Sequence, residues 1–165
     1  MWETAAVYET PEDLERLQAL LDRSYQSSGA HMRTIITPAR RLDAKGLAKR
    51  LTGVRVLSLA TVTADARPLV APVDGLFYRG EWWFGSADDS VRFAHIRARP
   101  QVSATYAEGE EYSVSVHGTA VEIDLAEHPG FTDYCIEIYG KDWAHWGAPY
   151  ARINADKIFT FVAPV

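Results

Sequence analysis

Two hydroxyl side chains and one guanidinium lie close together at the start of a basic helix, where they could bind a phosphate. An aromatic strand ends just before Ser86, and the helix carries Ser90 and Arg92 in its first residues. The start of a helix presents unpaired amides and a partial positive charge, so an anion placed there could also be bound by both hydroxyls and Arg92. Arg92, His95 and Arg99 fall at spacings of three and four, which places them on one face of the helix.

Ordinary helix capping explains the same residues. Asp88 or Asp89 can cap a helix over residues 90–99, and an arginine-rich helix face is usually only solvated. Two aspartates beside the first turn also complement the helix dipole and would repel an anion if they pointed inward. Local chemistry therefore leaves both interpretations open.

Alternating apolar residues predict that most of the chain after residue 53 is made of strands. Pro68 and Pro72 cannot donate to a ladder, so the strand that contains them needs an edge or a bulge at these positions. Gly118 marks an expected bulge in a later strand. The expected strands cover residues 54–62, 69–78, 82–84, 101–106, 112–123 and 158–162.

A helix is expected to start at Thr10, which provides a hydroxyl cap just before a proline and two acidic residues. Leu14, Leu17, Leu21 and Tyr25 then follow at helical spacing. This stripe predicts a packing face, directed either at the rest of the chain or at a second subunit.

Two further helices are expected, one that begins after Asp43 and ends before Gly53, and one over about residues 126–139. The basic segment 31–41 is expected to lie extended across the surface. Cys135 lies on the apolar stripe of the later helix, so it is expected to be a buried small hydrophobic residue and not a nucleophile.

Composition excludes several classes of function. The chain has 165 residues, of which 47% are hydrophobic, and this predicts one domain over 1–165 with a helical extension over about 1–52. Its net charge of −5 argues against nonspecific binding of nucleic acid. A single cysteine excludes an internal disulfide, and no membrane-length apolar run or signal peptide is visible, so a cytoplasmic protein without membrane partners is expected.

Common enzyme motifs are missing from the sequence. It contains no GxGxxG fingerprint, no P-loop and no GxSxG elbow. The five histidines are scattered without a local metal-ligand spacing, although ligands from distant segments remain open. No catalytic residue and no metal site are therefore assigned.

The spacing of Phe84, Ser86, Ser90, Arg92 and Pro100 resembles that of the FMN-binding split barrels related to pyridoxamine 5′-phosphate oxidase. Residues 57–73, LSLATVTADARPLVAPV, look like the first hairpin of that family, and the resemblance covers about the middle half of the chain. It implies a mainly β (α+β) fold: a six-stranded antiparallel split β-barrel with peripheral helices.

The same resemblance implies a cofactor site. Ser86, Ser90, Val91 and Arg92 would hold the cofactor phosphate, and main-chain groups at Pro72 and Val73 would meet the flavin ring. A plain bulged strand is the alternative interpretation of Pro72 and Val73.

Two departures from the family pattern are visible. Val70 and Gly75 stand near positions where the vitamin oxidase carries basic residues, which argues against that particular oxidase activity. The hairpin turn contains Asp65 and Ala66 where relatives often have Asp-Gly, so a longer turn of a different type is expected, because alanine enters left-handed turns less freely than glycine.

The resemblance therefore implies an FMN-dependent oxidoreductase that acts on a small molecule, with a nicotinamide donor as a candidate second partner. A deazaflavin-dependent reductase is the first alternative, and a non-catalytic flavin- or haem-binding protein is the alternative from a different class. A homodimer is expected, both from the family and from the apolar surface of the leucine stripe and the segment containing Trp143 and Trp146.

Overall fold

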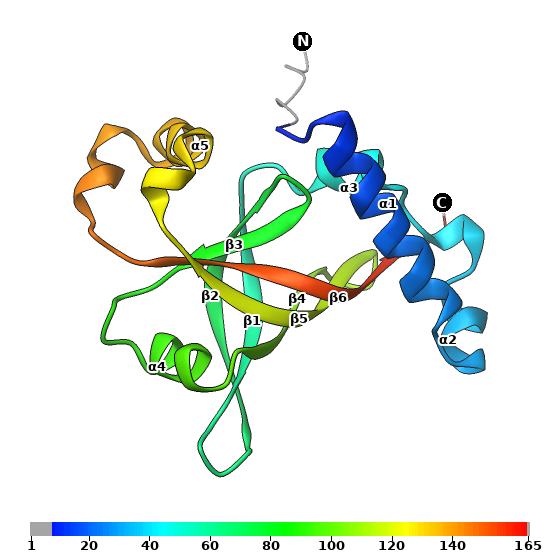
Figure 1. Cartoon of the computed structure of the whole chain (residues 1–165). Coiled ribbons are helices and arrows are strands. Elements are labelled where there is room, and N and C mark those ends of the chain that lie inside the picture. Colours follow the sequence, from blue (N-terminus) through cyan, green and yellow to red (C-terminus); the bar gives the residue numbers. More distant parts are fainter. Residues whose placement is uncertain (1–7, 165) are drawn as a thin grey trace.

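The fold is a closed barrel of six antiparallel strands (Figure 1). The computed structural model describes residues 8–164. The strands are neighbours in the order β1-β2-β3-β6-β5-β4, so the last strand of the chain closes the barrel between β3 and β5. This confirms the expected fold class. The strands are β1 (Val54–Val62), β2 (Pro68–Tyr78), β3 (Glu81–Gly85), β4 (Gln101–Glu108), β5 (Tyr112–Ile123) and β6 (Tyr150–Val162).

Helices are arranged around the barrel, and three α-helices precede β1. Figure 1 shows α1, α2 and α3 on one side of the barrel and α5 on the other, with α4 beside the projecting hairpin of β1 and β2. The α-helices are α1 (Pro11–Gln26), α2 (Ala30–Ile35), α3 (Ala44–Arg50), α4 (Val91–Ala98) and α5 (Pro129–Tyr139), and the short 3-10 helices are η1 (Pro38–Arg40), η2 (Leu125–Glu127) and η3 (Lys141–His145).

Inward-facing side chains, which alternate with outward-facing ones along each strand, fill the interior of the barrel. Leu57, Leu59 and Thr61 of β1 are almost completely buried, whereas Val56, directly before Leu57, faces outward. The leucine stripe of α1 packs on this core through the buried Leu17. The sequence left two packing partners open for this stripe. The structure shows that it packs on the barrel of its own chain.

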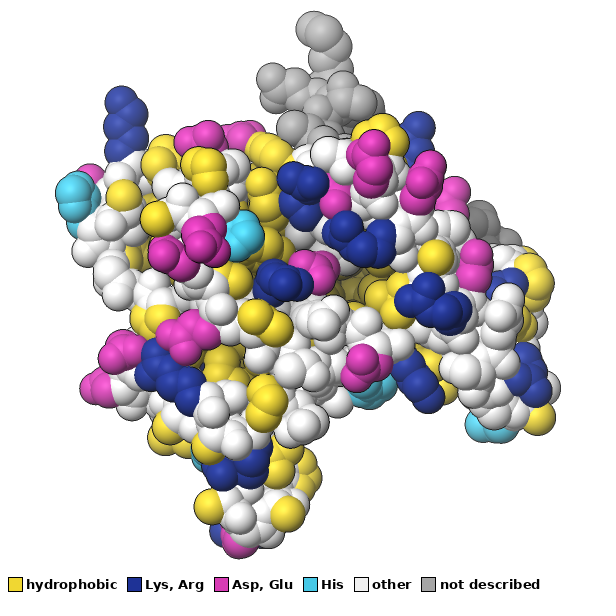
Figure 2. Space-filling model, viewed as in Figure 1, with side chains coloured by type: hydrophobic (Ala, Val, Ile, Leu, Met, Phe, Trp, Pro, Cys, Tyr) yellow, Lys and Arg dark blue, Asp and Glu magenta, His cyan; other side chains and the backbone are white. Residues whose placement is uncertain are grey.

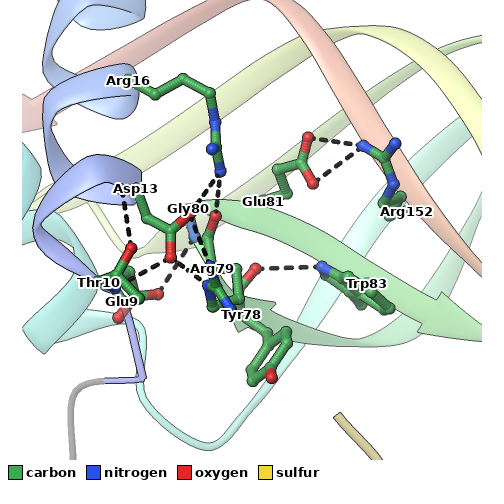
Figure 3. A network of polar contacts seen from close by, with 10 residues as sticks. All are labelled: Glu9, Thr10, Asp13, Arg16, Tyr78, Arg79, Gly80, Glu81, Trp83 and Arg152. Atoms are coloured by element: carbon green, nitrogen blue, oxygen red, sulfur yellow. Dashed lines mark hydrogen bonds and ion pairs between the residues drawn. The ribbon is translucent and has the colours of Figure 1, made fainter. Parts of the chain in front are cut away.

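The start of α1 is fastened to the turn between β2 and β3 by a buried carboxylate (Figure 3). Asp13 is only 2% exposed and accepts hydrogen bonds from the Thr10 amide at 3.0 Å and from Arg16 at 3.0 Å. It also pairs with Arg79, whose carbonyl oxygen accepts a further bond from Arg16 at 2.9 Å. One side chain thus completes the predicted helix cap and joins the helix to the hairpin.

The two prolines of β2 lie at an open edge of the sheet. β2 pairs with β1 along its whole length, but it pairs with β3 only from Gly75 onward. The Thr63 amide donates to the Arg67 carbonyl at 2.9 Å, which makes these two residues a hydrogen-bonded pair. Hydrogen-bonded and non-hydrogen-bonded pairs alternate along antiparallel strands, so the main-chain groups of Pro68 and Pro72 point away from β1. The expected edge is confirmed, and the ladder between β1 and β2 continues without a bulge.

The turn between β1 and β2 is a five-residue loop, because Val62 and Pro68 are the last paired residues. The expectation of a longer turn is confirmed, but its stated reason is wrong. Ala66 does adopt a left-handed conformation, with φ of +62°. Hydrogen bonds from the Thr63 hydroxyl to the Arg67 carbonyl at 3.1 Å and from the Arg67 amide to that hydroxyl at 2.9 Å hold the loop around it.

Three segments differ from expectation. Residues 31–41 are not extended, since they contain α2 and η1, and the burial of Ile36 anchors them. β6 begins at Tyr150 and not at the expected residue 158. The sequence prediction missed the first part of this strand, because its exposed polar residues hide the alternation of apolar and polar positions. The helix expected over residues 126–139 is interrupted at His128, after which Pro129 starts α5.

A second core of aromatic residues lies between α5 and the hairpin of β2 and β3. Trp83 and Phe131 pack in a tilted arrangement with their ring centroids 4.3 Å apart. Cys135 is completely buried in this cluster, and burial raises the pKa of its thiol to about 12. The expectation that Cys135 is a buried hydrophobic residue is therefore confirmed.

Candidate functional site

The candidate site lies where β3 ends and α4 begins. Its loop leaves the sheet after Gly85 and enters the helix at Ser90. Ser90 is the N-cap, and its hydroxyl accepts a hydrogen bond from the Phe93 amide at 3.2 Å. The prediction that Asp88 or Asp89 caps this helix is therefore wrong, because the Ser90 hydroxyl already accepts the hydrogen bond of the free amide.

Arg92 links three parts of the chain at this point. It donates to the Ser86 hydroxyl at 3.1 Å and to the Pro72 carbonyl, on the open edge of β2, at 2.9 Å. Burial lowers the pKa of its guanidinium from the ordinary value. A guanidinium carries five N–H donors and these two bonds use two of them, so donors remain for a ligand.

The first turn of α4 provides further donors. The amides of Val91 and Arg92 have no backbone acceptor among the described residues. The Ser90 hydroxyl accepts a bond from Phe93 and donates none among these residues, so its proton is available to a ligand. The side chain of Val91 is 61% exposed, so the helix start is open to solvent. The donors converge on a place where an anion also meets the positive end of the helix dipole.

A shallow hollow of about 210 Å³ opens beside these donors, between the hairpin and α4. Thr61 and Ala71 form part of its strand wall, and Val91 forms part of its helix wall. Its floor is apolar, so the site combines a polar anion-binding end with a surface suited to a flat apolar group. The lining residues are Leu59, Thr61, Leu69, Ala71, Ser90, Val91 and Arg92.

The structure brings Pro72, Ser86, Ser90, Val91 and Arg92 together, as the spacing predicts for a single site. Val73 is placed differently. It lies opposite Leu57 with its side chain 8% exposed, and alternation turns its main chain toward β1. The main-chain groups at the open edge come instead from the even-numbered residues Val70, Pro72 and Asp74. Which residues of β2 face this edge depends on the hydrogen-bond register, which was not visible in the sequence.

The other basic residues of α4 do not converge on this place. His95 pairs through Nδ1 with the Thr61 hydroxyl at 2.9 Å, and Arg99 donates to the Val62 carbonyl at 2.8 Å. They do share the predicted face with Arg92, but each bonds to a different point along the hairpin. Arg92 is therefore the basic side chain of this face that lies at the helix start.

Two other features are absent from residues 8–164. This part of the chain contains no group of three or more histidine, cysteine, aspartate or glutamate side chains arranged to hold a metal ion. None of its helices is long and apolar enough to cross a membrane.

The barrel and the loop that leads into α4 define a split-barrel protein. Residues 44–163 match the family model described as pyridoxamine 5′-phosphate oxidase, so the chain belongs to that family. No curated protein matches the chain in sequence.

Solved structures share the fold while differing in their named ligands. An FAD-binding protein of Mesorhizobium loti is 25% identical with a TM-score of 0.57, over 74% of this chain and 96% of that one. A haem storage protein of Vibrio cholerae is 16% identical with a TM-score of 0.55, over 66% and 85%. An F420 reductase is 15% identical with a TM-score of 0.52, over 66% and 92%. One barrel thus serves proteins named for three different cofactors.

Proposed function

We propose that the protein is an FMN-dependent oxidoreductase acting on a small molecule, with the cofactor phosphate held at the start of α4. The observation that carries the proposal is the position of Arg92, which bridges Ser86 and the open edge of β2 directly beside the unpaired amides of the helix. Ser90 and Val91 complete the phosphate site, and the apolar hollow next to it accommodates part of the ring.

The flavin would supply the redox chemistry when bound, and the chain supplies binding and orientation. The carbonyl of Pro72 is already used by Arg92, so Pro72 positions the guanidinium and marks the edge along which the ring would lie. Val73 would contribute through the buried wall behind that edge. Val70 presents no charge here, which leaves Arg92 as the main fixed cation and predicts only partial cofactor occupancy on purification.

A deazaflavin-dependent reductase is the second candidate, because a phosphate in the same place would satisfy the same donors. Titration with FMN and with the deazaflavin, followed by fluorescence, ranks the two. A non-catalytic flavin- or haem-binding protein would bind its ligand without reducing it in the presence of a nicotinamide or deazaflavin donor. Failure of both flavins to bind below millimolar concentration would remove the basis of the redox proposal.

Replacing Arg92 with alanine tests the phosphate site. FMN affinity should fall roughly ten- to a hundredfold, because one charge-assisted interaction contributes about 1.5–3 kcal/mol. The melting temperature should fall by no more than a few degrees, since the bond from Arg92 to the Pro72 carbonyl lies at an exposed position where water can replace it. Titration calorimetry and thermal melting measure both quantities.

Arg67→Ala is the matched control, because Arg67 lies in the turn of the neighbouring β1–β2 hairpin with its side chain 77% exposed. This control should leave FMN affinity unchanged. If Arg92→Ala instead melts much earlier than the parent and binds FMN equally well, Arg92 is a structural residue and the site assignment is wrong.

A homodimer remains our proposal, now on different grounds. Trp143 is buried and the leucine stripe packs on its own barrel, so neither offers free apolar surface, although Trp146 remains exposed. Apolar side chains are exposed instead on the projecting hairpin (Figure 2). They adjoin the candidate site, so a second copy seated there would cover the hollow and help to enclose the cofactor. The exposed side chains are Val56, Leu69, Val70 and, on α4, Val91.

Val70→Asp should therefore shift the protein from dimer to monomer at micromolar concentration, because Val70 is 64% exposed and a buried unpaired carboxylate at an interface is costly. Light scattering measures the mass directly. Val121→Asp on β5 is the control, since Val121 is also partly exposed but lies on a different strand, and it should leave the mass unchanged. A monomeric parent protein would refute the shared-site proposal.

A further inference from the structure

The loop that carries the two hydroxyls of the candidate site has few contacts of its own. At its ends, the Ser86 amide donates to the Pro149 carbonyl at 3.3 Å, and the Ser90 amide donates to the Ala87 carbonyl at 3.0 Å. Ala87, Asp88 and Asp89 in the middle are exposed. Something else must therefore fix the middle of the loop if Ser86 and Ser90 are to keep a constant separation.

Arg97 provides this contact from the later part of α4. It donates to the Asp88 carboxylate at 2.6 Å and to the Asp88 carbonyl at 3.2 Å. The same guanidinium forms a bidentate ion pair with the Glu122 carboxylate of β5, with hydrogen bonds of 2.9 and 2.7 Å. Figure 2 shows basic side chains lying beside acidic ones in the region of α4. One side chain thus connects the loop, the helix and the barrel wall.

We propose that Arg97, held by Glu122, is a positioning residue that sets the geometry of the anion site through Asp88. This inference rests on the proposed function, because it concerns the phosphate that Ser86, Ser90 and Arg92 would bind. Arg97 does not touch that anion itself. It acts by fixing the backbone between the two serines and by pairing the one carboxylate that is tied to this part of the loop.

The charges around Arg97 explain why its loss matters. Asp88 and Glu122 share one guanidinium, and the hydrogen bond from Arg97 holds the pKa of the Glu122 carboxyl below its ordinary value. Without Arg97 the two carboxylates repel each other, the loop loses its fixed point, and Asp88 adds an uncompensated negative charge near the helix start. Each of these changes weakens binding of an anion and leaves binding of a neutral ring unaffected.

A comparison of FMN with riboflavin isolates this effect, because the two ligands differ only in the phosphate. In the parent protein FMN should bind more tightly than riboflavin. In Arg97→Ala the affinity for FMN should fall about three- to tenfold while that for riboflavin stays within about twofold, as expected for a loss confined to the charged group. Fluorescence titration of the full chain gives all four constants.

Two further variants separate positioning from general stability. Arg97→Ala/Asp88→Asn removes the uncompensated carboxylate and should recover part of the lost FMN affinity. Arg152→Ala breaks another arginine–glutamate ion pair, in which one guanidinium nitrogen of Arg152 donates to both carboxylate oxygens of Glu81 at 2.9 and 3.0 Å. This pair lies away from the loop, so the ratio of FMN to riboflavin affinity should stay unchanged. Thermal melting of each variant confirms that it is folded.

The outcomes are distinguishable. If the parent protein does not prefer FMN to riboflavin, the proposed phosphate site is wrong and the role of Arg97 falls with it. If the parent prefers FMN and Arg97→Ala retains that preference in full, the phosphate site stands and only the positioning role is overturned. An equal loss of both affinities, matched by Arg152→Ala, would make Arg97 a general structural residue.

Discussion

Replacing Asp13 with alanine is expected to destabilise the protein by about 3 kcal/mol, because it removes a helix cap and the buried partner of two arginines at once. Asp13 is 2% exposed, so no water replaces its bonds with Thr10, Arg16 and Arg79. Urea unfolding measures the loss. Arg16→Ala is the matched control and should cost less than about 1 kcal/mol, since the Arg16 side chain is 59% exposed.

The same carboxylate should make stability depend on acidity. Burial by itself raises the pKa of Asp13, but the hydrogen bonds from Arg79 and Thr10 outweigh it and hold that pKa below the ordinary value of about 3.8. A lowered carboxyl pKa stabilises the fold above the unfolded value, and the stabilisation is lost as the pH falls through the folded value. Unfolding free energy should therefore drop below about pH 4 in the parent and less steeply in Asp13→Asn; parallel curves would contradict this role.

Gly118→Ala should be the most damaging small substitution in the barrel, costing more than about 3 kcal/mol or preventing folding. Gly118 lies at the register shift between β5 and β6, so the irregularity is found at the predicted position, but the extra unpaired residue is Asp156 of β6 and not a residue of β5. A Cβ atom there would lie 2.2 Å from the Asn154 carbonyl oxygen and 2.8 Å from the Ala155 Cα. Both atoms belong to the backbone of the partner strand, so relief requires the ladder itself to separate.

Gly29→Ala provides the comparison, because nothing lies within 4 Å of a Cβ atom at Gly29. Its melting temperature should stay within a few degrees of the parent, while that of Gly118→Ala falls steeply or the variant is recovered unfolded. Equal melting of the two variants would show that the bulge can absorb a methyl group.

Local sequence signals predicted the parts of the fold that depend on neighbouring residues. The cap at Thr10 and the cap at Asp43 follow from a few adjacent positions and are confirmed. The irregularity expected at Gly118 is also present, although its extra residue lies on β6. The start of β6 was missed, because Asn154, Asp156 and Lys157 face outward and lower the apolar signal of a strand whose inner face is buried.

Contacts between distant residues were beyond the reach of such signals. Asp13 and Arg79 are 66 positions apart, and each looks locally like an ordinary acidic or basic surface residue. Arg97 and Glu122 are likewise 25 positions apart and are brought together only when α4 folds back against the barrel. The candidate site was partly predictable because Ser86, Ser90 and Arg92 lie within one short segment, whereas the contribution of Pro72 depends on which way each main chain turns in β2.

The prolines of β2 also bear on how the protein behaves at high concentration. A strand from another molecule can add to an open sheet edge only if main-chain donors and acceptors alternate along it. Pro68 and Pro72 remove two donors from the open edge of β2, and Arg92 already bonds to the Pro72 carbonyl. The edge can therefore stay accessible for a ligand and yet be a poor template for fibrous aggregation.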